Sequence, residues 1–314
     1  MGFVPLRPAS IWLRSCPTPI CTALPPATFL FIPGPRNSKP CWRSVSTVIN
    51  KDLAARHFDI RSRSYEEHAR VQKQMAAMLQ QQAGAAGNFT NILEIGCGPG
   101  YLTRLIAALY PRARILATDI APGMLSTAKA RLADCTNVSY ALEDGENLQT
   151  AEAFDLVISN AAFQWFNDQA KAYAGFLARL RPGGCLLYAT FGPETFRELH
   201  ASFHLARQTL RLQAPTRHGQ DFAPAATLEK LMTGLGYEDT VHREAYVREY
   251  FPSVKEFLAG VKKIGANNAG PRGSFVVNRR LMFSMMRCYE ESYCENNQIY
   301  ATYHIIYGFG RKKK

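Results

Sequence analysis

The residues with the clearest capacity for chemistry lie in a glycine-rich turn, LEIGCGPG at 93–100. Gly96, Gly98 and Gly100 alternate here directly after an apolar stretch. Glycine lets the backbone reach positive φ values and lets a ligand lie against bare peptide. Dinucleotide-binding proteins place a similar turn at the same point, so the turn alone does not decide the ligand. The last glycine of the G-x-G-x-x-G pattern is replaced by Tyr101, which provides less well for the close approach of a pyrophosphate.

Three acidic residues lie at the ends of successive predicted strands. Glu94 precedes the glycine turn, Asp119 closes the second strand, and Asp144 follows the third strand in the string EDGENL. A carboxylate is unfavourable beside phosphates, whereas Glu94 suits the cationic amino and sulfonium end of S-adenosylmethionine. Asp119 can accept from both ribose hydroxyls, and Asp144 can accept from the adenine amino group. In an open parallel sheet these strand ends converge on one crevice, so we expect an S-adenosylmethionine site there.

Cys97 stands between two of the glycines, and we interpret it as a small space-filling residue of the turn rather than as a nucleophile. No cluster of His, Cys and Asp has metal-ligand spacing, and neither a nucleophile elbow nor a phosphate-binding lysine loop occurs. We therefore expect no metal, and a reaction that the cofactor itself drives. The eight cysteines form no CxxC pair and no regular framework, which favours a reducing compartment, the cytoplasm.

The net charge of +12 is unevenly distributed along the chain. Residues 1–51 hold six basic residues and no acid, so half of the net charge lies there, and residues 254–287 hold seven basic residues and one acid. Such a local excess indicates an acidic partner for one face rather than a nucleic-acid tract, although a solvated helix surface gives the same pattern. No stretch approaches the roughly 20 uninterrupted apolar residues of a membrane helix. We expect neither a nucleic-acid partner nor a membrane.

Residues 1–47 differ from the rest, because they are rich in Pro, Ser and Thr, lack acids and show no helical or strand period. We expect this leader to be disordered and to stay outside the fold. Two interpretations remain open, an organellar transit peptide or an extension that is not part of the working protein. The prolines disfavour the amphipathic helix of a mitochondrial signal. Residues 48–314 then form one domain around the predicted cofactor site.

From about residue 52 the pattern becomes regular, and apolar residues at helical spacing predict a helix over 64–82. Strands and helices then alternate, which indicates an α/β fold with a mainly parallel sheet and helices on both faces. Predicted strands cover 91–95, 113–118, 138–142, 154–160 and 185–191. Predicted helices cover 101–110, 122–133, 169–180 and 225–235.

The second half changes character, since helices over 194–212 and 254–264 are added to the sheet and do not continue the alternation. They lie within two expected cap insertions, 192–224 and 252–296, which would supply a cover for the substrate. Alternating apolar residues also predict two late strands that could form an edge hairpin, 246–251 and 300–309.

At this point the chain resembles a class I methyltransferase over roughly residues 85–310. That Rossmann-like fold has a seven-stranded sheet whose last strand is antiparallel. Within the superfamily the chain is most similar to the malonyl-[acyl-carrier protein] O-methyltransferase family, over 58–308. Long strings in the cap are more specific than a glycine turn, and the leader lies outside the match. The similarity rests on SYEEHARVQ (64–72), SNAAFQWFND (159–168), TFGPETFRELH (190–200), FPSVKEFLAGVKKIGANN (251–268) and ATYHIIYG (301–308).

The resemblance implies methyl transfer from S-adenosylmethionine to the free carboxylate of a malonyl group carried on acyl carrier protein, or on coenzyme A. This is the step that starts pimeloyl and biotin synthesis. A carboxylate with a reference pKa of about 4 is ionised at pH 7, so its attack on the sulfonium methyl needs no general base. Positioning and partial desolvation can then supply the catalysis. This agrees with the lack of a catalytic constellation in the sequence.

The resemblance also assigns roles along the cofactor crevice. Glu94 and the glycines line the methionine end, Asp119 holds the ribose, and Asp144 lies at the adenine edge. The backbone of Asn160 touches the cofactor, and Tyr65 on the lid helix closes over it. The full set of cofactor-binding candidates is Tyr65, Glu94, Gly96, Cys97, Gly98, Gly100, Asp119, Ile120, Met124, Asp144, Gly145 and Asn160.

Candidates for positioning the acceptor are Tyr65, Gln164, Trp165 and Phe222, and core packing is the alternative role for Tyr65 and Phe222. Strand alternation puts Tyr303 and His304 on opposite faces of the sheet, so we interpret His304 as a core or edge histidine and not as a base. Docking of the acidic carrier protein is assigned to the basic cap residues Lys255, Lys262, Lys263, Arg272, Arg279 and Arg280.

Three alternatives remain beside this hypothesis. A carboxyl or carbon methyltransferase for a free small molecule would have the same cofactor half. A methyltransferase-like assembly factor would explain a transit leader and would lie in an organellar matrix. A nucleic-acid binder would need aromatic residues interleaved with the charge, which the sequence lacks. The strings in the cap favour the carrier-protein enzyme.

Overall fold

The computed structural model describes residues 49–62, 69–212, 220–263 and 279–314 of the chain. Contacts divide the chain into two units, 1–47 and Val48–Lys314, and every element given below belongs to the second. The predicted leader lies outside the described residues, as do Tyr65 and Arg272.

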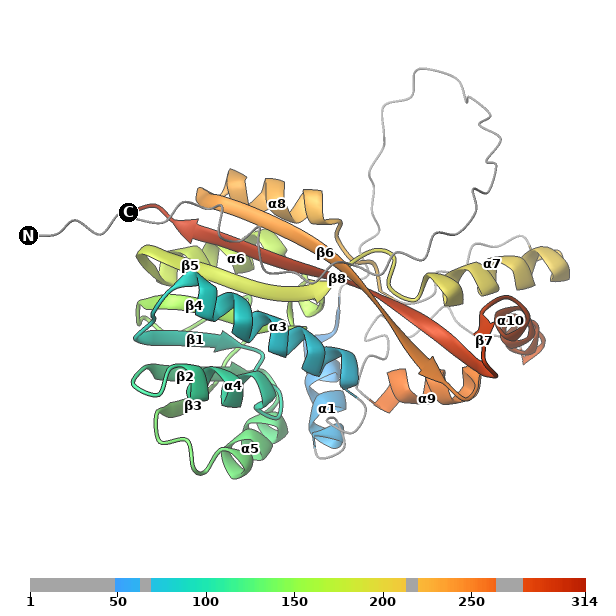
Figure 1. Ribbon diagram of the computed structural model, residues 1–314, viewed down its shortest axis with the longest axis horizontal. Coiled ribbons are helices and arrows are strands. Elements are labelled where there is room, and N and C mark those ends of the chain that lie inside the picture. Colours follow the sequence, from blue (N-terminus) through green and yellow to red (C-terminus); the bar gives the residue numbers. More distant parts are fainter. Residues whose placement is uncertain (1–48, 63–68, 213–219, 264–278) are drawn as a thin grey trace, which may run out of the picture. The chain divides into compact units, whose positions relative to one another are not determined.

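A single mixed sheet forms the centre of the second unit (Figure 1). Its strands are β1 (Asn91–Ile95), β2 (Arg114–Asp119), β3 (Val138–Leu142), β4 (Phe154–Asn160), β5 (Leu180–Phe191), β6 (Tyr237–Phe251), β7 (Cys294–Glu295) and β8 (Gln298–Lys312). They lie in the order β3-β2-β1-β4-β5-β8-β6, with β7 paired to the start of β8. The first five strands are parallel, and β8 is antiparallel to both β5 and β6. The predicted α/β class is confirmed, with the two-residue β7 added to a seven-stranded, mainly parallel sheet.

Helices cover both faces of this sheet. They are α1 (Lys51–Arg61), α3 (Arg70–Ala86), α4 (Tyr101–Leu109), α5 (Pro122–Arg131), the 3₁₀ turn η2 (Phe163–Trp165), α6 (Gln169–Arg179), α7 (Arg197–Leu210), α8 (Ala225–Gly234), α9 (Val254–Lys263) and α10 (Arg279–Ser292). Leu93 and Ile95 of β1 belong to the core beneath α6 and α8. Glu94 lies between them, and because strand residues alternate it faces the other side, where α3 and α4 pack.

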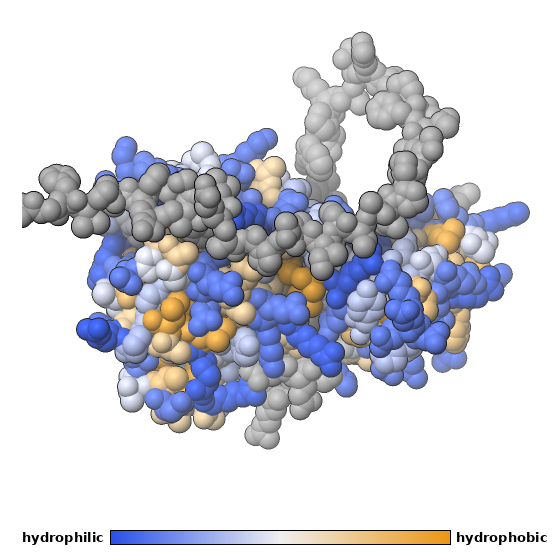
Figure 2. All heavy atoms as spheres, in the orientation of Figure 1, coloured by the Kyte–Doolittle hydropathy of each residue, from blue (hydrophilic) through white to orange (hydrophobic). Residues whose placement is uncertain are grey.

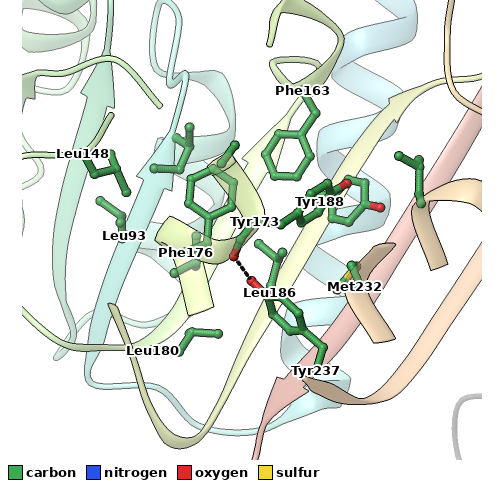
Figure 3. Close-up of a cluster of buried hydrophobic side chains, with 14 of the residues drawn as sticks. Leu93, Leu148, Phe163, Tyr173, Phe176, Leu180, Leu186, Tyr188, Met232 and Tyr237 are labelled. Carbon is green, nitrogen blue, oxygen red and sulfur yellow. Dashed lines mark hydrogen bonds between the residues drawn. The ribbon is translucent and has the colours of Figure 1, made fainter. Parts of the chain in front are cut away.

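A core cluster of aromatic and aliphatic side chains lies between the sheet and helices α6 and α8 (Figure 3). Phe163, directly after β4, stacks on Tyr188 of β5 with ring centroids 4.5 Å apart, and it also stacks on Phe176 of α6. The hydroxyl of Tyr237 donates to the carbonyl oxygen of Tyr173 at 2.8 Å. Each aromatic pair contributes about 0.5–1.5 kcal/mol beyond its buried area. The cluster therefore fixes the turn that follows β4 at the carboxyl edge of the sheet.

Strands β6 and β8 reach beyond the other strands. β8 pairs with β5 only over 305–311, whereas its residues 300–304 pair with β6 alone. The two strands thus form a ribbon that extends past the carboxyl ends of the parallel strands. Helices α7, α9 and α10 pack at this end (Figure 1) around a core of their own, in which Phe257 and Tyr289 are fully buried. This helical cap, formed by α7, α9 and α10, therefore lies beyond the sheet edge where the predicted cofactor acids end.

Several element predictions are corrected by the structure. The predicted lid helix over 64–82 begins at Arg70 and runs to Ala86, and its first residues lie outside the described ranges. The two late strands pair, yet they are no hairpin, because α9, α10 and β7 lie between them and β8 is inside the sheet. The helices α1 and α10 were not predicted. For α1 a signal existed, since Asn50 is its N-cap and accepts from the backbone N–H of Leu53 at 2.9 Å.

None of the helices in the described ranges is long and apolar enough to cross a membrane. Polar side chains cover most of the face seen in Figure 2, and apolar side chains gather there only in small patches.

Candidate functional site

The glycine turn joins β1 to α4 in a conformation that side chains disfavour. Gly96, Gly98 and Gly100 have φ angles of 68°, 54° and 89°. A Cβ on Gly96 would lie 2.6 Å from the Cβ of Ala162, whereas a Cβ on Gly98 would meet nothing within 4 Å. A Cβ on Gly100 would lie 2.7 Å from Leu132 Cδ1. Gly98 therefore faces open space. Gly100 is needed for close packing of the turn and α4 against α5.

Two adjoining cavities lie at this turn, and both are lined by Gly96, Gly98 and Asn160. The larger encloses about 740 Å³ with its open mouth included, and the smaller about 410 Å³. Predicted residues that line the larger cavity are Gly96, Gly98, Asp119, Ile120, Met124, Asp144, Gly145, Asn160 and Trp165. Those that line the smaller are Glu94, Gly96, Cys97, Gly98 and Asn160. The three strand-end acids therefore do converge on one edge of the sheet.

Glu94 presents a buried carboxyl group to the smaller cavity. The residue is 2% exposed, and burial raises the pKa of its carboxyl to about 8, with a further rise from the charge of Asp119. Its Oε2 atom has no hydrogen-bond partner among the residues that the structure describes. A buried carboxylate without a partner is costly, so this atom is suited to a cationic group in the cavity.

Asp119 is held in place at the end of β2 by backbone donors. Its Oδ2 accepts from the N–H of Gly98 at 2.9 Å, and its Oδ1 accepts from the N–H of Ala121 at 2.8 Å. Burial raises the pKa of the carboxyl to about 6, which leaves it ionised at pH 7. Each oxygen keeps a free acceptor site, so the group can still receive hydroxyl donors.

Asp144 lies in the loop after β3, and an unpredicted partner reaches it from α1. Lys51 Nζ donates to both carboxylate oxygens of Asp144, at 2.7 and 2.6 Å, and also forms an ion pair with Glu146. Lys51, Ala54 and Phe58 together make one wall of the larger cavity. Sequence reasoning missed this wall because it began the ordered elements at the next helix.

Asn160 ends β4 between the two cavities. Its side-chain Nδ2 donates to the carbonyl oxygen of Gln72 at 2.9 Å, which ties β4 to α3. Its Oδ1 finds no partner within the described part of the chain. Ala69, Gln72 and Lys73 of the α3 segment line the smaller cavity, so the described part of the predicted lid segment does border the site.

Cys97 is not a reactive thiolate in this setting. The residue is 5% exposed and packs with Ala117, Leu125 and Ala128. Burial, followed by the charges of the neighbouring acids, raises the pKa of its thiol well above the usual range. The thiol stays protonated at neutral pH, as the space-filling interpretation requires.

Two of the predicted acceptor residues line neither cavity. The Gln164 side chain is engaged locally, since its Nε2 donates to the carbonyl oxygen of Ala161 at 2.6 Å and its Oε1 accepts from Thr190 Oγ1 at 3.2 Å. Phe222 packs toward Phe191, with ring centroids 6.1 Å apart. Trp165 is the predicted acceptor residue that borders the larger cavity.

Tyr303 and His304 have different neighbours, in keeping with strand alternation. Tyr303 lies edge-on to Phe196 with centroids 4.8 Å apart. His304 is 3% exposed and stacks on Tyr246, and its Nδ1 lies 3.3 Å from the N–H of Glu194. The imidazole borders neither cavity, so it has the packing role that the sequence indicated.

The predicted docking residues in the described part of the cap lie at its surface. The exposed ones are Lys255, Lys262, Lys263, Arg279 and Arg280, whereas Arg272 is outside the described residues. Figure 2 shows that hydrophilic side chains predominate at the cap end of the molecule.

Comparison with known proteins agrees with this geometry. Residues 92–184 match the family model of a methyltransferase domain. A malonyl-[acyl-carrier protein] O-methyltransferase of Acetivibrio thermocellus is 41% identical over 273 residues, which cover 85% of this chain and 95% of that protein. One of Bacillus anthracis is 38% identical and covers 83% of this chain and 97% of the relative.

A solved structure supports the fold. Phosphoethanolamine N-methyltransferase 2 of Haemonchus contortus, in complex with S-adenosyl-L-methionine, superposes with a TM-score of 0.52 at 18% identity. The match covers 82% of this chain and 57% of that one. The sequence identity to the two bacterial relatives, over most of each chain, shows that this chain belongs to the malonyl-[acyl-carrier protein] O-methyltransferase family.

Proposed function

We propose that this protein transfers a methyl group from S-adenosylmethionine to the free carboxylate of a malonyl thioester carried on acyl carrier protein, the first step toward pimeloyl and biotin synthesis. The observation that carries the proposal is the pair of cavities at the glycine turn, with Glu94, Asp119 and Asp144 at three successive strand ends. Family membership supplies the substrate, because both bacterial relatives are named for malonyl-acyl carrier protein.

The residues present fit S-adenosylmethionine. Glu94 Oε2 lacks a donor within the described residues and can pair with the cationic amino group of the methionine end. Gly98 faces open space, so the backbone there can approach a ligand closely. Asp119 keeps free lone pairs for the ribose hydroxyls, and Ile120 and Met124 line the larger cavity where an apolar base would lie. When bound, the cofactor supplies an electrophilic sulfonium methyl group.

The protein then has to bind and orient the cofactor and the malonyl carboxylate, and no residue has to move a proton. A malonyl carboxylate is ionised at pH 7, so it would need no general base to accept the methyl group that the bound cofactor would supply. No histidine is among the described residues that line the two cavities. Trp165 and Phe58 border the larger cavity and keep water from that wall. Alignment and partial desolvation are therefore the means of catalysis.

The exposed basic residues of the cap offer a docking face for the carrier protein, which is acidic. Lys255, Lys262 and Lys263 of α9, with Arg279 and Arg280 at the start of α10, form the described part of this basic cap face. Complementary charge steers association and fixes the register of two proteins. Because the cap extends past the carboxyl edge of the sheet, a carrier protein docked there would be on the same side as the cofactor cavities. We keep the cytoplasm as the expected location.

A methyl-transfer assay with labelled S-adenosylmethionine tests the function. The substrates are malonyl-acyl carrier protein, malonyl coenzyme A and free malonate, with acetyl-acyl carrier protein as the matched control that lacks the free carboxylate. We expect methyl ester formation on malonyl thioesters alone, with the carrier-protein form preferred, and mass spectrometry locates the ester. Cofactor binding without turnover of either malonyl thioester would point to the small-molecule alternative.

A further inference from the structure

Helix α1 forms a wall of the larger cavity and is fastened at both of its ends. At its start, Lys51 pairs with Asp144 in the loop after β3. Near its end, the ring of Phe58 meets Trp165 edge-on with centroids 5.2 Å apart. The next residue, Asp59, accepts from the backbone N–H of Gly123 in the first turn of α5, at 2.7 Å. The helix therefore contacts three separate segments at the carboxyl edge of the sheet: the loop after β3, the turn η2 and the first turn of α5.

Hydrogen-bond counting shows that Lys51 and a ligand can share Asp144. An ionised carboxylate has four lone-pair sites. Lys51 Nζ takes one site on each oxygen, at 2.7 and 2.6 Å, and the backbone N–H of Glu146 takes the second site on Oδ1 at 3.0 Å. One site on Oδ2 is left. The ammonium group thus fixes the direction of the carboxylate and still leaves an acceptor for one amino hydrogen.

The electrostatic setting makes this lysine more than a surface charge. The side chains of Lys51, Asp144 and Glu146 are 24%, 31% and 5% exposed. Two carboxylates this close repel each other in a partly desolvated loop, and a single cation between them removes the repulsion. Without it the loop after β3 would open and α1 would lose its attachment at the adenine side. Partly buried pairs of this kind are screened less by salt than exposed ones.

We propose that Lys51 is a cofactor-positioning residue, which aims the Asp144 carboxylate at the adenine amino group and holds α1 as the wall of the adenosine cavity. The inference rests on the proposed function, since it takes S-adenosylmethionine as the occupant. It adds a residue that supports the cofactor from outside the sheet and the glycine turn.

The test measures binding of S-adenosylhomocysteine by calorimetry to the full chain and to the Lys51→Met and Lys51→Arg variants. Arg104→Met is the matched control, because it removes the ion pair of Arg104 with Asp134, 3.0 Å long and exposed, away from both cavities. A second readout uses Trp165. With Trp12 and Trp42 replaced by Phe, Trp165 is the sole tryptophan, and its quenching by acrylamide reports whether α1 covers it.

We expect Lys51→Met to raise the dissociation constant about tenfold, equivalent to about 1.4 kcal/mol, and to make Trp165 more accessible to acrylamide. Lys51→Arg should keep most of the wild-type affinity, and Arg104→Met should have the dissociation constant of the wild type. Unchanged or tighter binding by Lys51→Met would overturn the inference, because the lysine would then be idle or in competition with the adenine. If the wild-type chain itself bound no S-adenosylhomocysteine, the proposed function would fail instead.

Discussion

Glu94 gives cofactor binding a pH dependence whose size and sign can be worked out. Burial raises the pKa of its carboxyl to about 8, and its Oε2 has no donor within the described residues. The free protein is therefore mostly protonated at this position at pH 7, while a cationic ligand binds the ionised form. Binding below pH 8 must release a proton, so affinity rises with pH. One pKa unit corresponds to about 1.4 kcal/mol, and from pH 6 to pH 7 the dissociation constant should fall about tenfold.

Calorimetry with S-adenosylhomocysteine measures this directly, in two buffers whose ionisation heats differ. We expect the release of nearly one proton per ligand at pH 7. The window from pH 6 to pH 7 is informative because the α-amino group of the ligand, which lies beside its own α-carboxylate, stays charged there. Glu94→Gln should bind more weakly and lose most of the proton release, keeping only the part from Asp119, whose pKa is about 6. Equal proton release and equal pH dependence in the wild type and Glu94→Gln would refute the reasoning.

The raised pKa of Glu94 also predicts that the ligand-free protein loses stability relative to Glu94→Gln as pH rises from the ordinary pKa of 4.5 to about 8, which thermal melts at pH 6 and pH 9 would check. Asp119→Ala should raise the cofactor dissociation constant at least about tenfold, since a charged acceptor for the ribose is lost, and unchanged binding in calorimetry would argue against the site. Gly96→Val should abolish binding and lower the melting temperature, because its Cβ would lie 2.6 Å from that of Ala162 at a positive φ. Reversing Lys262 and Lys263 to Glu should raise the Michaelis constant for malonyl-acyl carrier protein and leave that for malonyl coenzyme A nearly unchanged. A Michaelis constant for malonyl-acyl carrier protein equal to that of the wild type would exclude the basic cap face as the docking face.

The cofactor half was predictable because its signals are local in the sequence. Each parallel strand is a short apolar run, and the residue that follows it must lie at the carboxyl edge. Glu94, Asp119 and Asp144 could therefore be placed together without knowledge of the helices. The glycine turn is equally local, since positive φ at Gly96 and Gly98 requires the residue type itself.

The parts that sequence reasoning missed depend on contacts between distant segments. Lys51 lies 93 residues before Asp144, and nothing in the spacing of either residue indicates the pair. Gln164 was expected at the acceptor, yet its side chain is occupied by the neighbouring Ala161 and by Thr190 of β5. Gly100 was expected to line the cofactor site like the other glycines of the turn. The structure instead shows that a side chain there would collide with Leu132, so glycine is needed at this position for packing. Tertiary packing decides such roles, and periodicity does not report it.

Two of the strings on which the family resemblance rested, 190–200 and 301–308, are in contact with each other. Gly192, from the string at 190–200, has no room for a side chain, since its Cβ would lie 2.5 Å from the ring of His304 in the string at 301–308. Thr195 Oγ1 donates to the carbonyl oxygen of His304 at 3.0 Å, and the buried Glu198 accepts from the N–H of Thr302 at 3.0 Å.

These bonds join the first turn of α7, and Thr195 just before it, to β8, the strand whose outer part carries the cap. These two strings therefore specify how the cap is attached to the sheet rather than a set of catalytic groups. This is the expected pattern for an enzyme that needs no general base, because its rate depends on where the acceptor is held relative to the methyl group. The attachment of the cap should then determine which substrate is accepted, and the residues at the strand ends should determine which cofactor binds. The two properties should be separable within one fold.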